Sequence, residues 1–231
     1  MIRFARINIG EGAGPTCSRC ATPAPTPNFR SAEDIVAEIR EVTEAWTAPV
    51  GPNVVFGGFE PFSHPELPAL INAARLAGVT RVCLETDGGA LAQPVNAHGA
   101  FRSGVRHLRV RTLGIGREAD ELAGRPGLSA GAVSGIHAFL QAATEAEDKV
   151  AVAAVIPVCV HNVALLPSTV AALADAGVRA VSPVGNGTVP DASAATIAAA
   201  CDTGTVNRVW VDVDDLPVPE SHLGHLAEDR S

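Results

Sequence analysis

The sequence has few charged residues, one lysine and no basic cluster, and these scarcities exclude several classes of protein. Charged residues make up 18% of the chain and apolar residues 47%, whereas a disordered chain carries more charge and fewer apolar residues. Lys149 is the single lysine, and the net charge is −8. Because phosphate backbones and anionic lipids repel an acidic surface, we expect neither nucleic acid nor a membrane surface as a partner.

The sequence also lacks a long apolar run and a disulfide framework. No apolar stretch approaches the roughly 20 residues that span a bilayer, and residues 2–9 resemble a strand rather than a signal peptide. We therefore expect a cytoplasmic protein. Of five cysteines, Cys17 and Cys20 lie close together. In a cytosolic chain they are interpreted as reduced thiols or ligands. The apolar surroundings of Cys83, Cys159 and Cys201 are typical of small buried side chains.

Short β-type runs alternate with helical patterns along the chain. This alternation predicts one α/β domain over residues 1–215, with a parallel sheet, and a polar acidic tail over 216–231. Helices are predicted to begin at Ser31 and Pro65 and over 130–146, 167–176 and 191–201, with a short or broken one after the third strand. The predicted strands are residues 2–9, 53–56, 81–85, 107–111, 150–157, 178–184 and 208–213.

This pattern fits either an open doubly wound sheet or a partial barrel. In both, ligands bind at the carboxyl ends of the strands. The loop after the first strand contains Cys17 and Cys20, whose thiolates suit zinc, an iron–sulfur cluster or a redox disulfide. The loop after the second strand contains Gly57, Gly58 and Glu60. There, paired glycines let backbone approach a ligand, and a carboxylate can receive an ammonium group.

Taken together, these loops resemble the radical S-adenosylmethionine (radical SAM) superfamily over roughly residues 1–215. That family has a CxxxCxxC loop after the first strand, a GGE-P…HP stretch after the second and a T-N/D-G…L stretch after the third. The resemblance implies a partial (βα)6 TIM-like barrel. The matching stretches are Ala13…Cys17…Cys20, Gly57-Gly58-Phe59-Glu60-Pro61…His64-Pro65 and Thr86-Asp87-Gly88…Leu91.

The resemblance also implies cofactors and the residues that hold them. Cys17 and Cys20 would ligate a 4Fe–4S cluster. Gly57, Gly58 and Glu60 would hold the methionine part of SAM, whose reductive cleavage gives a radical that abstracts hydrogen from a small-molecule or peptide substrate. By position, two further residues, Thr112 and Asn162, would contact ribose or substrate, and Arg111 is a candidate for the same role.

Two departures from the family pattern leave alternatives open. Ala13 stands where the family has its first cysteine, and Phe59 splits the GGE motif. The site either builds a cluster with a substitute ligand such as Glu11, or belongs to a clusterless descendant that binds a small molecule or a partner enzyme. Alternatively, Ala13 is an introduced substitution.

A hypothesis from another functional class is a zinc or thiol-redox protein that uses Cys17 and Cys20 with Cys83 or Cys159. Scattered histidines such as His64 are interpreted as packing residues rather than ligands. The aspartates at 212, 214 and 215 are interpreted as a solvated edge.

Overall fold

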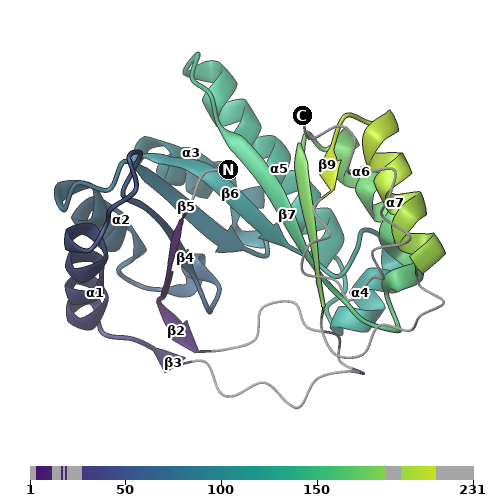
Figure 1. The fold of residues 1–231 in the computed structure, drawn as a ribbon, viewed down its shortest axis with the longest axis horizontal. Helices are drawn as coiled ribbons and strands as arrows, with labels where there is room; N and C mark the ends of the chain where they lie inside the picture. The colour runs from purple at the N-terminus through teal and green to yellow at the C-terminus, as the bar shows by residue number, and fades with distance from the viewer. Residues whose placement is uncertain (1–3, 12–16, 18, 20–27, 186–193, 212–231) are drawn as a thin grey trace.

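The computed structural model describes residues 4–11, 17, 19, 28–185 and 194–211. In this part of the chain, seven strands pair in parallel in the order β1-β4-β5-β6-β7-β8-β9, and β2 and β3 form a small antiparallel pair beside them (Figure 1). The strands are β1 (Ala5–Asn8), β2 (Gly10–Glu11), β3 (Asn28–Phe29), β4 (Asn53–Gly57), β5 (Arg81–Thr86), β6 (Val105–Arg111), β7 (Ala151–Val158), β8 (Ala180–Gly185) and β9 (Trp210–Val211).

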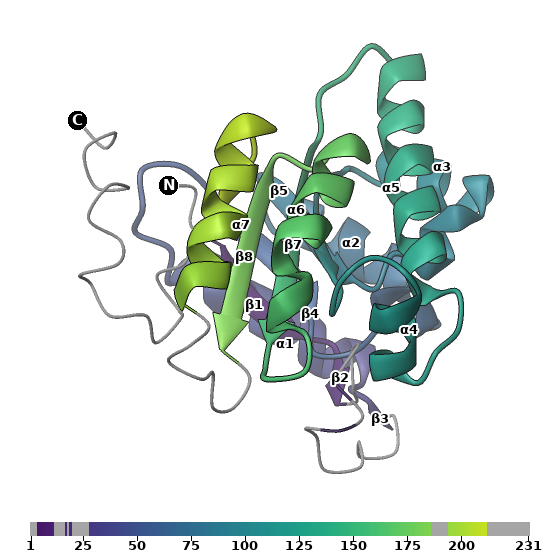
Figure 2. The same cartoon turned by 90° about the vertical axis from the view of Figure 1, so that its right-hand side faces the viewer.

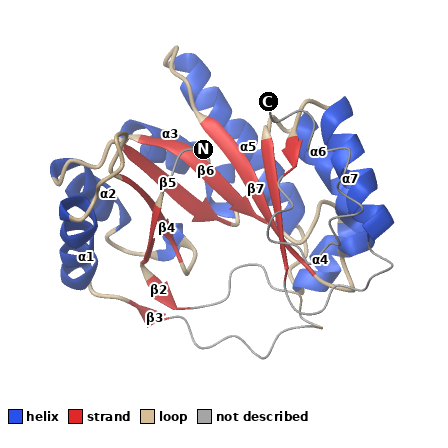
Figure 3. Ribbon diagram, viewed as in Figure 1, coloured by secondary structure: helices blue, strands red, loops and turns tan. Residues whose placement is uncertain are grey.

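Helices follow the strands and cover the outer face of the sheet, as Figures 2 and 3 show. Short 3₁₀ helices precede three of them: η1 (Pro61–Ser63), η2 (Gly89–Ala92) and η3 (Val163–Leu165). The α-helices are α1 (Ala32–Glu44), α2 (Leu67–Leu76), α3 (Pro94–Arg102), α4 (Arg117–Ala123), α5 (Leu128–Glu145), α6 (Leu166–Asp175) and α7 (Ala194–Val206).

The order of the large sheet follows the order of the chain, and the sheet curves (Figure 1). Each new strand is added at the same edge, which is how strand–helix units build a barrel. The prediction of a single α/β domain with a parallel, partial TIM-like barrel is confirmed, with a two-residue seventh strand. The predicted tail, residues 216–231, lies outside the described residues.

Burial alternates along β6, β7 and β8, which separates the two faces of the sheet. In β7, Val152, Ala154 and Ile156 are buried, whereas Ala153 and Val155 are partly exposed. The buried set packs with the helices in one continuous core. The other set lies on the concave face, because successive residues of a strand point to opposite sides. The concave face is therefore accessible to solvent and to ligands.

Local sequence signals explain most element boundaries. Ser31 caps α1 as predicted, since its side chain accepts a hydrogen bond from the Asp34 N–H at 3.1 Å. The predicted helix start at Pro65 is two residues early, because the Leu67 N–H bonds to the His64 carbonyl and closes a turn first. Neither α4 nor the β2–β3 pair was predicted.

Among the described residues, no helix is long and apolar enough to cross a membrane.

Candidate active site at the carboxyl ends of β4 and β5

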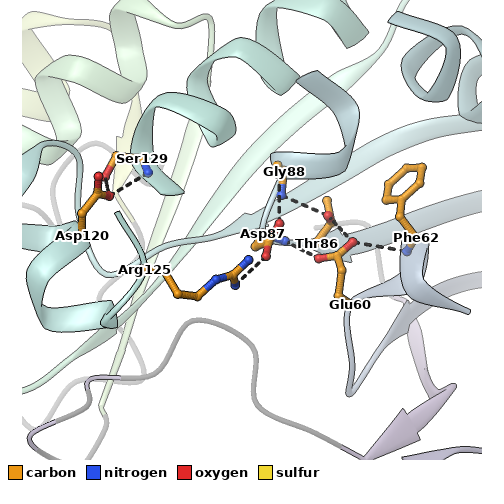
Figure 4. Close-up of polar contacts among 9 residues, drawn as sticks. Glu60, Phe62, Thr86, Asp87, Gly88, Asp120, Arg125 and Ser129 are labelled. Atoms are coloured by element: carbon orange, nitrogen blue, oxygen red, sulfur yellow. Dashed lines mark hydrogen bonds and ion pairs between the residues drawn. The ribbon is translucent and has the colours of Figure 1, made fainter. Parts of the chain in front are cut away.

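Glu60 lies where the loop after β4 meets the end of β5 (Figure 4). Its Oε1 accepts hydrogen bonds from the Thr86 hydroxyl at 2.7 Å and the Phe62 N–H at 3.2 Å. Its Oε2 accepts one from the Asp87 N–H at 2.7 Å. These donors fix the carboxyl group at the carboxyl ends of two neighbouring strands, where barrel enzymes bind ligands.

A second carboxylate, that of Asp87, lies beside Glu60. The Asp87 side chain accepts a hydrogen bond from the Gly89 N–H at 2.9 Å and an ion pair from Arg125 at 2.8 Å. Burial and the charge of Asp87 together raise the pKa of Glu60 from 4.5 to about 7, against the opposing effect of the hydrogen-bond donors. A cation placed at Glu60 would offset both the cost of burying the charged carboxyl and the repulsion from Asp87, because a nearby positive charge favours the ionised form.

The glycine pair before Glu60 is accounted for by packing within the protein. A Cβ on Gly57 would lie 2.9 Å from Nη2 of Arg6, and one on Gly58 would lie 2.8 Å from the Gly10 carbonyl oxygen. Gly58 also has φ +86°, a conformation that favours glycine. Gly58 is thus required by the close approach of β2, and Gly57 accommodates the Arg6 side chain from β1, whether or not a ligand contacts them.

Phe59 and His64 also have structural explanations. Phe59 makes an edge contact with Phe29 of β3, with ring centroids 5.1 Å apart. The buried ring of His64 accepts from the Glu66 N–H at 3.1 Å through Nδ1, and its Nε2 lies 3.2 Å from the Arg30 carbonyl. With Nδ1 as acceptor, Nε2 carries the proton and donates it. The geometry agrees with the interpretation of His64 as a packing residue.

Thr112 and Asn162 are both buried, and their polar groups are engaged by backbone. The Thr112 hydroxyl donates to the Gly114 carbonyl at 2.6 Å. The Asn162 amide oxygen accepts from the Cys159 N–H at 2.7 Å, and its NH₂ donates to the Leu113 and Pro157 carbonyls at 2.8 Å. Asn162 therefore joins the ends of β6 and β7, and contact of either residue with a ligand stays a prediction.

Cys17 is buried in a small apolar cluster with Leu113, Leu122 and Cys159. Ala13 and Cys20, the other motif positions, lie outside the described residues, and Glu11 is exposed on β2. Within the described ranges, no group of three or more His, Cys, Asp or Glu side chains is placed to hold a metal ion. Within this cluster, the neighbours of Cys17 are apolar side chains apart from the thiol of Cys159, and they offer no oxygen or nitrogen ligand to iron.

Cys83 does not suit the zinc or thiol-redox alternative. It is buried on β5, and burial raises the pKa of its thiol to about 12. A thiol with that pKa is protonated at neutral pH, and only the thiolate ligates metal or attacks a disulfide.

Arg111 was expected to contact a ligand, but the other charged side chains around it on the concave face were not predicted. Arg6 of β1 forms a two-pronged ion pair with Glu85 of β5, both N–O distances being 2.8 Å. Arg111 of β6 lies 3.5 Å from the same carboxylate. Burial disfavours the charged form of Glu85, but the hydrogen bonds from Arg6 and the charges of Arg111 and Arg109 outweigh it and lower the pKa. Arg109 and Arg111 could have been placed together from their spacing of two, which puts both on one face of a strand.

A surface cavity of about 920 Å³ opens between α4 and the start of α5. Its lining includes Ile115, Pro126 and Val133, and Arg125 reaches from the same α4–α5 connection to Asp87 (Figure 4). The volume is in the range of small-molecule sites.

In solved structures, this fold is similar to that of radical SAM enzymes. SuiB from Streptococcus suis, bound to the precursor peptide SuiA, matches with a TM-score of 0.65 and 13% identity over 90% of this chain and 48% of SuiB. Methylornithine synthase (PylB) matches with a TM-score of 0.57 and 11% identity over 96% of this chain and 68% of PylB. TsrM from Kitasatospora setae, a radical SAM methyltransferase with cobalamin and a 4Fe–4S cluster bound, matches with a TM-score of 0.52 and 14% identity over 79% of this chain and 36% of TsrM.

The chain spans about half the length of SuiB. Identities of 11–14% show a shared fold, and fold alone does not fix chemistry. No family model matches the sequence, and no curated protein matches it.

Proposed function

We propose that this chain is a radical-SAM-like protein that binds SAM at the carboxyl ends of β4 and β5, with the SAM ammonium against Glu60. The observation that carries the proposal is the partly buried Glu60 carboxyl, whose pKa is raised to about 7 by burial and by the charge of Asp87, with no ion pair among the described residues to supply a positive charge. An ammonium group supplies that charge and up to three hydrogen-bond donors.

The surroundings of Glu60 suit the rest of an amino-acid zwitterion. Arg125 donates to Asp87 through Nη1, and its side chain is half exposed. Its remaining guanidinium donors are available for the SAM carboxylate, because arginine offers five N–H groups in a planar fork. The proposed site therefore presents negative charge for the ammonium and positive charge for the carboxylate on neighbouring loops.

Equilibrium titration of SAM into the protein tests this proposal. Glu60→Gln keeps the shape of the side chain but removes the charge, and we expect at least roughly tenfold weaker binding from the loss of a charge-assisted contact. Glu66→Gln is the matched control, since Glu66 is exposed in the same loop. Equal affinity of the wild type and both variants, or no SAM binding by the wild type, would refute the proposal.

In our proposal, the protein binds SAM but does not assemble a complete site for an iron–sulfur cluster. Support comes from Ala13 in the first motif position and from the apolar packing of Cys17 against Leu113 and Leu122. Such a protein would bind a small molecule or act with a partner enzyme. SuiB binds a precursor peptide, which favours a peptide as one class of ligand for this barrel.

A second candidate is a radical enzyme, favoured by the spacing of Cys17 and Cys20. With a cluster bound, the site would supply reductive cleavage of SAM. Anaerobic reconstitution with iron and sulfide, followed by EPR with and without SAM, separates the candidates. A reduced cluster signal that SAM alters supports the enzyme. If the wild type binds no iron, Ala13→Cys shows whether restoring the thiol restores the cluster.

A further inference from the structure

We infer that the concave face of the barrel binds an oxyanion group of the substrate, a carboxylate or a phosphate, through Arg109 and Arg111 of β6. The assignment of the ligand as a substrate rests on the proposed function. The binding of the anion rests on the geometry and charge of this face alone.

The arginines share one face of the sheet by register. Glu85 of β5 pairs with Arg109, and Arg109 and Arg111 pair with Ala153 and Val155 of β7. Arg109 and Arg111 are two residues apart, which places them on the same side of β6 roughly 7 Å from each other. That spacing lets one oxyanion receive donors from both guanidinium groups.

Gly57 makes the ion pair between Arg6 and Glu85 possible. It lies between β1 and β5 in the sheet, and its missing side chain leaves room for Arg6 to cross β4 and reach Glu85. Arg6 donates Nε to Asn8 and both Nη atoms to Glu85. Both oxygens of the Glu85 carboxylate therefore accept hydrogen bonds from Arg6, and the arginines of β6 interact with this carboxylate at longer range.

The guanidinium groups of Arg109 and Arg111 have N–H donors that the described residues leave without an acceptor. In the described part of the chain, the Arg109 side chain makes no hydrogen bond or ion pair, and the Arg111 side chain makes one ion pair at 3.5 Å. The Arg111 Nε is buried and has no acceptor. Buried donors are nearly always satisfied in native proteins, so the described residues leave part of the hydrogen-bonding capacity of Arg111 unused. The Arg111 side chain is 32% exposed, which leaves the guanidinium reachable.

The charge of this face is opposite to that of the whole chain. Three arginines (Arg6, Arg109 and Arg111) surround one acid, Glu85, among the described concave-face residues, although the chain has a net charge of −8. Clefts lined by one sign of charge concentrate ligands of the other sign. Arginine forks match carboxylate and phosphate oxygens in particular.

The rest of the concave face suits the non-ionic part of such a ligand. Beyond Arg109, β7 and β8 present small, partly exposed side chains on the same face. These are Ala153, Val155, Ala180, Ser182 and Val184. The inferred substrate therefore has an anionic group at β6 and an uncharged part over β7 and β8.

The test uses inorganic phosphate and succinate as probes, titrated at constant ionic strength without SAM. Arg109→Gln and Arg111→Gln are compared with the wild type, and Arg40→Gln is the control because Arg40 is exposed on α1. Replacing Arg109 removes no hydrogen bond or ion pair seen among the described residues, so the fold should persist. Arginine Nε–Hε signals in NMR report the binding directly.

We expect the wild type and Arg40→Gln to bind at least one probe with equal affinity, and both β6 variants to bind it at least tenfold more weakly. Tighter binding of phosphate would indicate a phosphate-bearing substrate, and tighter binding of succinate a carboxylate. No binding of either probe, or equal binding by all proteins, would overturn the inference.

SAM affinity distinguishes this inference from the proposed function. We expect Arg109→Gln to bind SAM as the wild type does, because among the described residues no hydrogen bond or ion pair joins Arg109 to Glu60 or to its partners Thr86 and Asp87. A tenfold loss of SAM affinity in Arg109→Gln would instead assign the arginines to the SAM carboxylate and overturn the substrate assignment. Phosphate binding by a protein that fails to bind SAM would support the anion site and refute the proposed function.

Discussion

Glu60 should make the folded protein less stable as the pH rises from about 4.5 to about 7. Its pKa is raised to about 7 from an ordinary value of 4.5, first by burial and then by the charge of Asp87. In this pH range the folded state holds a proton that the unfolded state has lost. The free energy of unfolding therefore falls as the pH rises, which is the sign required for a carboxyl with a raised pKa.

The size of this effect follows from the pKa difference. A difference of one pKa unit corresponds to about 1.4 kcal/mol, so the change from 4.5 to about 7 corresponds to at most about 3 kcal/mol. Other groups titrate in the same range. The useful quantity is thus the difference in unfolding free energy between the wild type and Glu60→Gln, measured by urea denaturation from pH 4.5 to 8.

We expect Glu60→Gln to gain up to about 3 kcal/mol relative to the wild type over this range, most of it below pH 7. Glu66→Gln, which alters an exposed carboxyl in the same loop, should show a flat difference from the wild type. A flat difference for Glu60→Gln as well, or one of opposite sign, would refute the argument that partial burial and the charge of Asp87 raise the pKa of Glu60.

The remaining predictions concern packing and the concave face. Gly135→Ala should destabilise the protein by about 3 kcal/mol or more, because its Cβ would lie 2.1 Å from the Gly88 carbonyl oxygen. Gly99→Ala in α3, where nothing lies within 4 Å, should stabilise it by about 0.5–1 kcal/mol. Equal effects of the two changes in thermal unfolding would contradict the packing of α5 on η2. Arg6→Ala should cost about 1–3 kcal/mol at pH 7 by removing the partner of the buried Glu85 carboxylate. That loss should shrink as the pH falls and Glu85 is protonated, and urea denaturation at pH 7 and 4 would check it.

The fold was predictable because its signals are local and repeated. Strands that are buried against helices appear in the sequence as apolar runs. Glycines such as Gly78 and Gly177, which have positive φ, mark the ends of helices. The α4 helix was missed because it has only seven residues and sits in a loop of polar residues. The β2–β3 pair was missed because two-residue strands carry no periodic pattern.

The site was predictable only in part, because the side chains of motif residues can form hydrogen bonds with other parts of the same chain instead of with a ligand. Glu60 was expected at the site and lies at the predicted strand ends. Asp87 belongs to a stretch that resembles the family motif, but no sequence signal placed it beside Glu60 or paired it with Arg125. Asn162 was expected to contact a ligand, yet its amide binds three backbone groups. Such long-range contacts depend on how distant loops meet, which periodicity and spacing do not specify.

Proton release on SAM binding tests the central claim most directly. Calorimetric titration at pH 7, in two buffers with different ionisation enthalpies, gives the number of protons exchanged. At pH 7 a carboxyl with a pKa of about 7 is half protonated, and an ammonium would bind its ionised form. We predict that the wild type releases about half a proton more than Glu60→Gln. The same proton count in both proteins, or no SAM binding by the wild type, would contradict the assignment of Glu60 to the SAM ammonium.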